Sequence, residues 1–287
     1  MSQQPKPTRS QQREEARAKA ATLRAERAKG DKRKRTTKRA LLIVGSLAIV
    51  ALIGVLAINV GSSSNNGNNS NAEPANFNAT GGIKIGTGLR AYTKDFTPTP
   101  SVAKPVDVVI YEDLQCPVCH QFEIANSAQL QSWVSKGQVT IEYHPLSFLD
   151  GNSQNAYSSR AANALMCVGN FAPDQTFAYN NILYQYQPAE QTAGPDDTAL
   201  INFMANAGVQ VTQAIRDCVT KKTYGNYLSK MTAYEMTHKA IDGITTPDHT
   251  PTILVNGAVY AWPQSDADYS NPAPRFAQTI TAALAKH

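Results

Sequence analysis

The longest apolar stretch of the chain stands apart from the rest of the hydrophobic pattern. Residues 40–60 (ALLIVGSLAIVALIGVLAINV) contain no charged side chain. As a helix this stretch would be roughly 31 Å long, which matches the hydrocarbon core of a bilayer. A cleaved signal peptide normally has a shorter apolar region, of about 7–15 residues, and a shorter preceding segment. We therefore predict an uncleaved transmembrane anchor, with a cleaved signal peptide and a buried core helix as the alternatives.

The hydrophobic pattern stops after this stretch. Residues 61–71 contain only Gly, Ser and Asn, and the polar character continues to about Thr80. Such a composition is typical of a flexible linker, which we place at residues 61–80. The remaining part, residues 81–287, has a suitable length for one folded domain.

The first half of this domain alternates between strand and helix patterns. Two short β-branched runs, residues 106–111 (VDVVIY) and 139–143 (VTIEY), are typical of strands. Between them lies a helical apolar pattern that ends near Gly137. A strand, a helix and a second strand are therefore expected in this order.

The second half is mostly helical in pattern until a late hairpin. The helical part extends over about residues 155–241. A hairpin is expected around Asn256-Gly257, the dipeptide preferred in a type I′ turn, and a final helix over residues 272–286. This order of elements predicts an α/β fold with a helical subdomain inserted at about residues 153–241.

Charge is distributed unevenly along the chain. Of the 27 basic and 22 acidic residues, residues 1–39 hold 14 basic and four acidic ones, so this segment has a net charge of +10 and the rest −5. Basic residues directly precede the apolar stretch, and none follows it until Lys84. This asymmetry predicts a cytoplasmic N-terminal segment and an extracytoplasmic domain. A nucleic-acid-binding fold would carry its basic patch on the folded part, so we predict no nucleic-acid partner.

Two of the four cysteines form a Cys-x-x-Cys pair directly after the first predicted strand. Cys116 is expected at the first turn of the following helix, where free N–H groups and the helix dipole stabilise a thiolate. Pro117 suits that turn because proline has no N–H group to satisfy. Cys119 lies one turn later, so we assign Cys116 as the attacking or attacked sulfur and Cys119 as the resolving thiol.

Three other interpretations compete with a redox role for this pair. A structural zinc site normally needs four ligands, whereas Cys167 and Cys218 are isolated. A purely structural disulfide is compatible with an extracytoplasmic domain. Cys116 to His120 also matches the C-x-x-C-H pattern of c-type haem attachment. We favour the redox pair and expect no metal site.

A second motif near the C-terminus makes the pattern more specific. Residues 250–257 have the sequence TPTILVNG, and Pro251 opens a predicted strand, where proline is tolerated only at the first position or at an edge. A CPxC motif after a hydrophobic strand, together with this late Thr-Pro motif, resembles the DsbA-like thiol:disulfide oxidoreductases of thioredoxin fold. The resemblance covers about residues 81–287 and extends to membrane-tethered Gram-positive and actinobacterial members.

This resemblance implies roles for several residues. In the family, the proline matching Pro251 is cis and faces the dithiol, and the backbone of the residue matching Thr250 pairs with the bound polypeptide. Some members carry a second disulfide in the helical insertion, so we expect Cys167 and Cys218 to be bonded, with two unpaired buried thiols as the alternative. Members use no organic cofactor.

Between the two cysteines the sequence departs from the family. Its strong oxidants have a histidine there, whereas this chain has Pro117 and Val118. The oxidising strength is therefore open. His120 follows directly, and we expect it either to approach Cys116 across one turn or to be exposed to solvent.

A buried acidic residue of the first strand in many relatives is also missing, because Val108–Ile110 are apolar. Glu112 or Asp113 is a candidate proton relay, although we expect both to be loop carboxylates. His249 is a candidate neighbour of the dithiol.

We therefore predict an extracytoplasmic, membrane-anchored thiol:disulfide oxidoreductase that oxidises cysteine pairs in secreted proteins through Cys116 and Cys119. Its expected partners are reduced or misfolded secreted proteins and, by resemblance, a membrane quinone reductase of the DsbB or vitamin K epoxide reductase type. The alternatives are a reductase fed from the membrane, a tethered chaperone or binding module, and a c-type haem protein.

Overall fold

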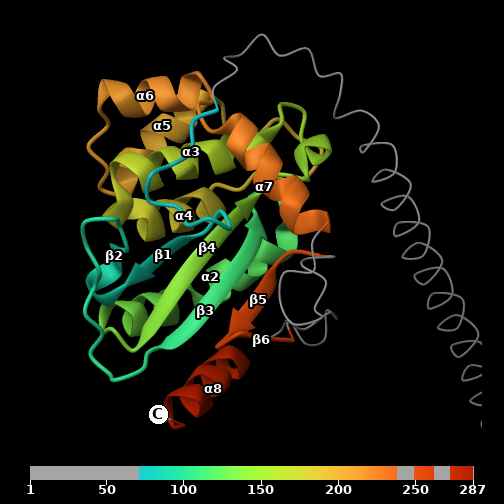
Figure 1. The fold of residues 1–287 in the computed structure, drawn as a ribbon. Helices are drawn as coiled ribbons and strands as arrows, with labels where there is room; N and C mark the ends of the chain where they lie inside the picture. Colours follow the sequence, from blue (N-terminus) through green and yellow to red (C-terminus); the bar gives the residue numbers. More distant parts are fainter. Residues whose placement is uncertain (1–70, 238–248, 262–271, 287) are drawn as a thin grey trace, which may run out of the picture. The chain divides into compact units, whose positions relative to one another are not determined.

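A mixed β-sheet forms the centre of the fold in the computed structural model, which describes residues 71–237, 249–261 and 272–286 (Figure 1). The strand order is β2-β1-β4-β3-β5-β6. The strands are β1 (Ile83–Gly86), β2 (Arg90–Ala91), β3 (Val106–Asp113), β4 (Val139–Leu146), β5 (Thr252–Val255) and β6 (Ala258–Val259). β3 is parallel to β4 and antiparallel to β5. The α/β class with a mixed sheet agrees with the prediction.

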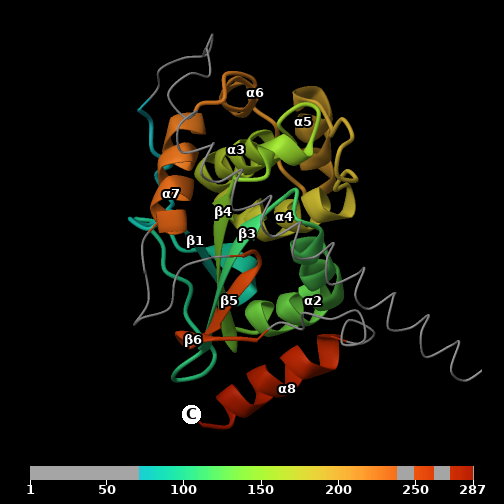
Figure 2. The same cartoon turned by 90° about the vertical axis from the view of Figure 1, so that its right-hand side faces the viewer.

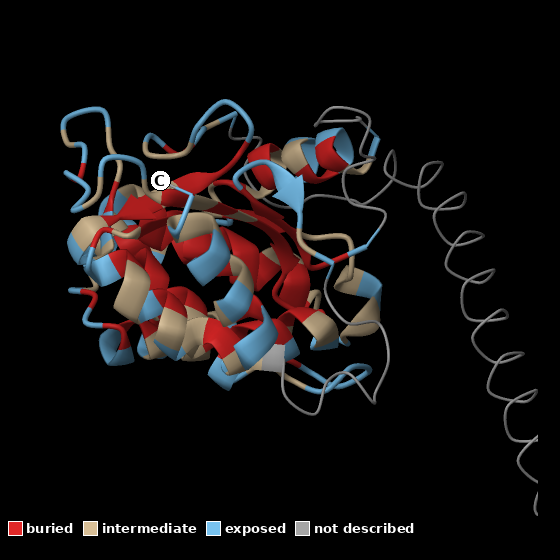
Figure 3. Ribbon diagram, turned by 90° about the horizontal axis from the view of Figure 1, so that it is seen from below, coloured by how far each residue is buried: buried red, intermediate tan, exposed pale blue. Residues whose placement is uncertain are grey.

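Helices cover both faces of this sheet. α2 (Pro117–Ser135) and α8 (Pro272–Leu284) lie on one side, and α7 (Gly225–Thr237) lies on the other (Figure 2). The alternation along β3 explains the two layers. Val108 and Ile110 pack in the cluster that includes α2 and α8, whereas Tyr111 belongs to a smaller cluster on the opposite face. The central strands β3, β4 and β5 and the inner faces of the helices are largely buried, whereas β6 is exposed (Figure 3).

The predicted helical insertion is present between β4 and β5. It consists of α3 (Tyr157–Phe171), α4 (Thr176–Gln185), α5 (Asp197–Asn206), α6 (Gln213–Thr220) and α7. Side chains define two of the helix starts: Asp196 accepts the N–H of Ala199 at 2.8 Å, and Thr212 accepts the N–H of Ile215 at 3.3 Å. A disulfide joins Cys167 on α3 to Cys218 on α6, so a covalent bond links the first part of the insertion to a later helix.

Several element boundaries differ from the sequence prediction. β1 and β2 were not expected, because two- and four-residue strands give too short a pattern to detect. β3 continues two residues further than predicted, to Asp113, and β6 is shorter than predicted. Gly169 lies inside α3, so a glycine does not interrupt this helix. Asn256 and Gly257 both have positive φ, as a type I′ turn requires.

The end of the predicted linker is ordered against the domain. The Asn78 amide donates to the Glu142 carboxylate at 2.7 Å, and its side-chain oxygen accepts the N–H of Gly82 at 2.9 Å. Phe77 packs against both large hydrophobic clusters. The domain therefore begins before residue 81, because polar side chains in this stretch bind to the domain instead of to solvent.

The predicted membrane anchor, residues 40–60, lies outside the described residues. Within the described ranges, no helix has both the length and the apolar character needed to cross a bilayer. The first part of the linker and the basic segment, residues 1–39, also lie outside them.

The Cys167–Cys218 disulfide should contribute strongly to stability. The two cysteines are 51 residues apart, and closing a loop of this size stabilises the fold by about 4 kcal/mol in the chain-entropy model. We expect Cys167→Ala/Cys218→Ala to lower the free energy of unfolding by about this amount in chemical denaturation. A Cys116→Ser/Cys119→Ser background removes changes at the other pair. Unchanged stability in that background would contradict the expectation.

Candidate active site

The turn between β3 and α2 places Cys116 at the N-cap of a 19-residue helix. Its backbone is extended, with φ −73° and ψ 120°, and Pro117 occupies the first helical turn. The N–H of Cys116 donates to the carbonyl of Asp113 at 2.9 Å, and its carbonyl accepts the N–H of His120 at 3.1 Å. The strand end and the first helical hydrogen bond thus fix the backbone on both sides of this cysteine.

The late Thr-Pro motif lies directly beside Cys116. The peptide bond between Thr250 and Pro251 is cis, and Sγ of Cys116 lies 3.4 Å from the carbonyl oxygen of Thr250. Strand pairing brings these distant segments together, because Thr252 on β5 is in register with Tyr111 on β3. The two motifs singled out in the sequence therefore form one site.

The two sulfurs have opposite ionisation properties. The pKa of Cys116 is lowered to about 6, mainly by a hydrogen bond from the Cys119 thiol. The backbone amides of Cys119 and Val118 add to this effect, whereas burial opposes it. Burial raises the pKa of Cys119 well above its ordinary value, and the proximity of Cys116 and Glu112 adds to this effect. Both are free thiols in the structure, and Cys119 is fully buried. At neutral pH, Cys116 is therefore a thiolate and Cys119 a thiol.

Two buried carboxyl groups lie beneath the dithiol. Glu112, at the end of β3, and Glu123, on α2, have at most 1 % exposure. Tyr184 donates its hydroxyl to Glu112 at 3.0 Å, whereas neither carboxylate oxygen of Glu123 has a hydrogen-bond partner among the described residues. Burial, reinforced by Glu123, raises the pKa of Glu112, and burial raises that of Glu123 to about 8. Burial therefore favours the protonated form of both groups.

The expectation that Glu112 and Asp113 are loop carboxylates is wrong. Both belong to β3 and are fully buried, because the strand continues into the space under the helical insertion. The Asp113 carboxylate accepts hydrogen bonds from the N–H groups of Gln115 and Leu149 and from the Ser158 hydroxyl. Burial nevertheless raises the pKa of Asp113 to about 7. This side chain connects the dithiol turn to the start of α3.

His120 takes neither of the two positions expected for it. It is half-buried, and its Nδ1 lies 2.9 Å from the Tyr184 carbonyl, on α4. Because the ring is bound there and Cys119 is fully buried, the C-x-x-C-H sequence does not present a haem attachment site. Pro117 is exposed and Val118 half-buried at the entrance to the pair.

The other candidate histidine lies two residues before Pro251. His249 is exposed, and its carbonyl accepts the Thr252 hydroxyl at 2.8 Å. Reasoning from the sequence missed Glu123 and Tyr184. Glu123 lies four residues after Cys119 on the same helix, and this spacing was the available signal; Tyr184 had none.

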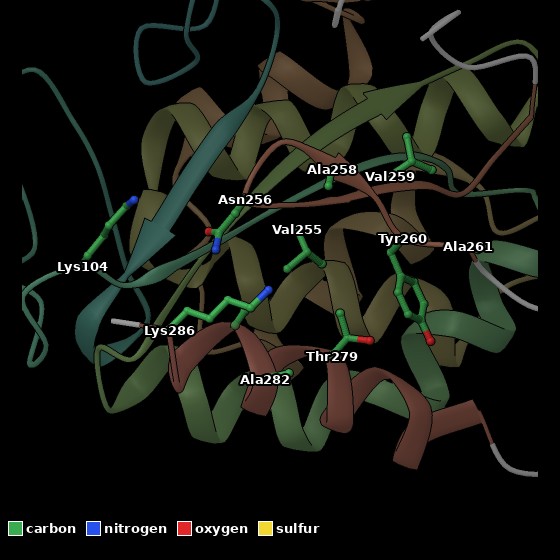
Figure 4. Close-up of a pocket in the computed structure, with 11 residues that line it drawn as sticks. Lys104, Val255, Asn256, Ala258, Val259, Tyr260, Ala261, Thr279, Ala282 and Lys286 are labelled. Carbon is green, nitrogen blue, oxygen red and sulfur yellow. The ribbon is translucent and has the colours of Figure 1, made fainter.

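A pocket of about 730 Å³ lies elsewhere, between the β5–β6 hairpin and α8 (Figure 4). Lys104, Val259, Tyr260 and Lys286 are among its lining residues, and neither cysteine of the pair belongs to it. In the described ranges, no three His, Cys, Asp or Glu side chains are grouped so as to hold a metal ion. The dithiol is thus the chemically distinctive site of the described domain.

Comparison with known families agrees with this geometry. A family model described as Thioredoxin matches residues 101–271, more than half of the 287-residue chain. The chain belongs to the thioredoxin family. The matched range includes the CPVC turn, the helical insertion and the cis-proline segment, which confirms the thioredoxin-like fold.

Two solved structures of Mycobacterium tuberculosis proteins have a similar fold. Oxidised DsbA has 26% sequence identity and a TM-score of 0.55, over 71% of this chain and 92% of that chain. Reduced DsbG has 26% identity and a TM-score of 0.54, over 69% of this chain and 85% of that chain. The predicted resemblance to DsbA-like proteins is confirmed, and it supports a protein disulfide oxidoreductase.

A curated relative, the serine/threonine-protein kinase PknE of Mycobacterium tuberculosis, is 29% identical over 117 residues. The match covers 39% of this chain and 21% of the kinase. The chain therefore spans about a fifth of the length of the curated relatives it matches.

The buried carboxyl group of Glu123 should make stability depend on pH. A carboxyl group whose pKa rises from 4.5 to about 8 on folding stabilises the fold fully below its unfolded pKa, and this contribution is lost as the pH rises towards 8. Between these values the loss is up to about 1.4 kcal/mol per pH unit. We therefore expect the unfolding midpoint of wild type to fall more steeply between pH 5 and 8 than that of Glu123→Gln.

Glu190→Gln is the matched control, because Glu190 is exposed. Its midpoint should follow that of the wild type. Parallel pH profiles for Glu123→Gln and wild type would show that the Glu123 carboxyl ionises normally.

Proposed function

We propose that this protein is an extracytoplasmic, membrane-anchored thiol:disulfide oxidoreductase that oxidises cysteine pairs in secreted proteins. The observation that carries the proposal is the placement of Cys116 at the N-cap of α2, beside the Thr250 carbonyl and one turn before the fully buried Cys119. Residues 40–60 would serve as the anchor, and the basic segment before them would keep the N-terminus in the cytoplasm.

The proposed reaction begins with the oxidised enzyme. A substrate thiolate attacks Sγ of Cys116, the Cys116–Cys119 bond breaks, and Cys119 leaves as a thiolate that takes up a proton. A second substrate thiolate then attacks the substrate sulfur of the mixed disulfide. The substrate disulfide forms, and Cys116 leaves as a thiolate. Two electrons pass from the substrate to the enzyme.

The surroundings of the two sulfurs suit this sequence. Cys116 is the better leaving group in the second step, because its pKa is about 6. Burial favours the protonated form of Glu112, and its carboxyl group lies close enough to Cys119 to influence the pKa of that thiol. We assign Glu112 as the donor that returns a proton to the sulfur of Cys119. Glu123 lies in the same buried region and favours the protonated form of Glu112.

The acidity of Cys116 also favours the oxidising direction. At pH 7, a pKa of about 6 stabilises the reduced enzyme by about 1.4 kcal/mol relative to a thiol that remains protonated. For a two-electron couple this raises the reduction potential by roughly 30 mV, which makes the enzyme a stronger oxidant. Reoxidation requires an electron acceptor, for which we propose a membrane quinone reductase of the DsbB or vitamin K epoxide reductase type.

Active-site variants of the full chain in detergent test this function. The oxidised wild type should restore disulfides and activity to reduced, unfolded ribonuclease. Cys116→Ser should abolish the reaction, because the attacked sulfur is missing. Cys119→Ser, first activated at Cys116 as a mixed disulfide with a small thiol, should exchange that thiol for ribonuclease and give a covalent adduct on a non-reducing gel.

The same assay separates the proposal from its main alternative. A tethered chaperone or binding module would retain its effect on ribonuclease refolding after Cys116→Ser. Full activity of that variant would therefore refute the proposed oxidoreductase function.

A further inference from the structure

Two glutamine side chains join the helical insertion to the turn that carries the dithiol. Gln187 lies in the loop between α4 and α5, and its amide nitrogen donates to the carbonyls of Leu114 at 2.9 Å and Cys116 at 3.0 Å. In the opposite direction, the Gln115 amide donates to the carbonyl of Pro188 at 3.2 Å. Gln187 is half-buried, and Gln115 is fully buried.

The two carbonyls that Gln187 binds lie on either side of Gln115. An amide nitrogen has two hydrogens, so one side chain satisfies both carbonyls and fixes the orientation of both peptide groups. The Cys116 carbonyl also accepts the first N–H of α2, from His120. This backbone orientation sets the direction of the Cα–Cβ bond of Cys116, and that direction places Sγ towards Thr250.

We propose that Gln187 is a positioning residue for the dithiol, which holds the carbonyls of Leu114 and Cys116 and thereby fixes the attacking sulfur at the helix N-terminus. This inference rests on the proposed function of Cys116. It gives the inserted subdomain a direct part in the chemistry, because the loop after α4 sets the geometry of a turn on the thioredoxin-like core.

The same contact has an electrostatic consequence. The positive end of the Gln187 amide lies against the carbonyl of Cys116, where it offsets a partial negative charge close to the sulfur. A negative charge in this place would instead oppose ionisation of Cys116, and a positive charge would favour it. We therefore predict that the pKa of Cys116 changes in steps with the charge of the side chain at position 187.

The test is a series of substitutions in the full chain: Gln187→Lys, Gln187→Met and Gln187→Glu. The pKa of Cys116 is read from ultraviolet thiolate absorbance of the reduced protein, in which Cys119 stays protonated. Relative to wild type, we expect the pKa to fall in the lysine variant, to rise by about one in the methionine variant and to rise further in the glutamate variant.

Gln185 supplies the matched control. It is exposed and lies two residues earlier in the chain, so the same three substitutions introduce the same charges where solvent screens them. We expect them to change the pKa of Cys116 much less. Because lysine at position 187 still donates hydrogen bonds, the series remains informative even if the methionine variant folds poorly.

The outcomes separate this inference from the proposed function. An unchanged pKa across the Gln187 series, or equal changes in the Gln185 series, would overturn the positioning role. Ribonuclease oxidation by wild type is measured in parallel. Its absence would remove the proposed function, whereas an active enzyme with an unresponsive Cys116 would remove only the role of Gln187.

Discussion

The site depends on the different environments of two sulfurs that are three residues apart. One lies at the N-cap of a long helix, where its negative charge is stabilised by hydrogen bonds and backbone amides. The other points into the core, where burial opposes ionisation. A dithiol with this asymmetry has a stabilised reduced state, a good leaving group at the helix N-cap and a fully buried thiol that is ready to resolve a mixed disulfide.

The rest of the domain maintains that difference. β3 leads directly into the turn that begins α2, and pairing of β3 with β5 brings the cis proline segment next to that turn. The helical insertion contributes Tyr184 to the buried acidic pair and Gln187 to the turn. The insertion therefore does more than cover the sheet, since its side chains bind to the groups that surround both sulfurs.

The chemically decisive parts of the site were predictable from the sequence because they are local. Strand followed by CPxC places Cys116 at a helix start, and a proline that opens a strand is unusual enough to single out Pro251. The fold class followed from the order of the elements. The buried acids were not predictable, because whether Glu112 lies in a loop or in a strand depends on the packing of the insertion above it. The contacts of Gln187 likewise depend on a loop whose path no local pattern specifies.

The most direct test is the reduction potential of the Cys116–Cys119 couple as a function of pH. With Cys116 ionising near pH 6, the potential should change by about 59 mV per pH unit below that value and by about 30 mV per unit above it, because one proton fewer is taken up on reduction. At pH 7 it should lie about 30 mV above the value extrapolated from the slope below pH 6. A slope of about 59 mV per pH unit that continues to pH 8 would contradict the account.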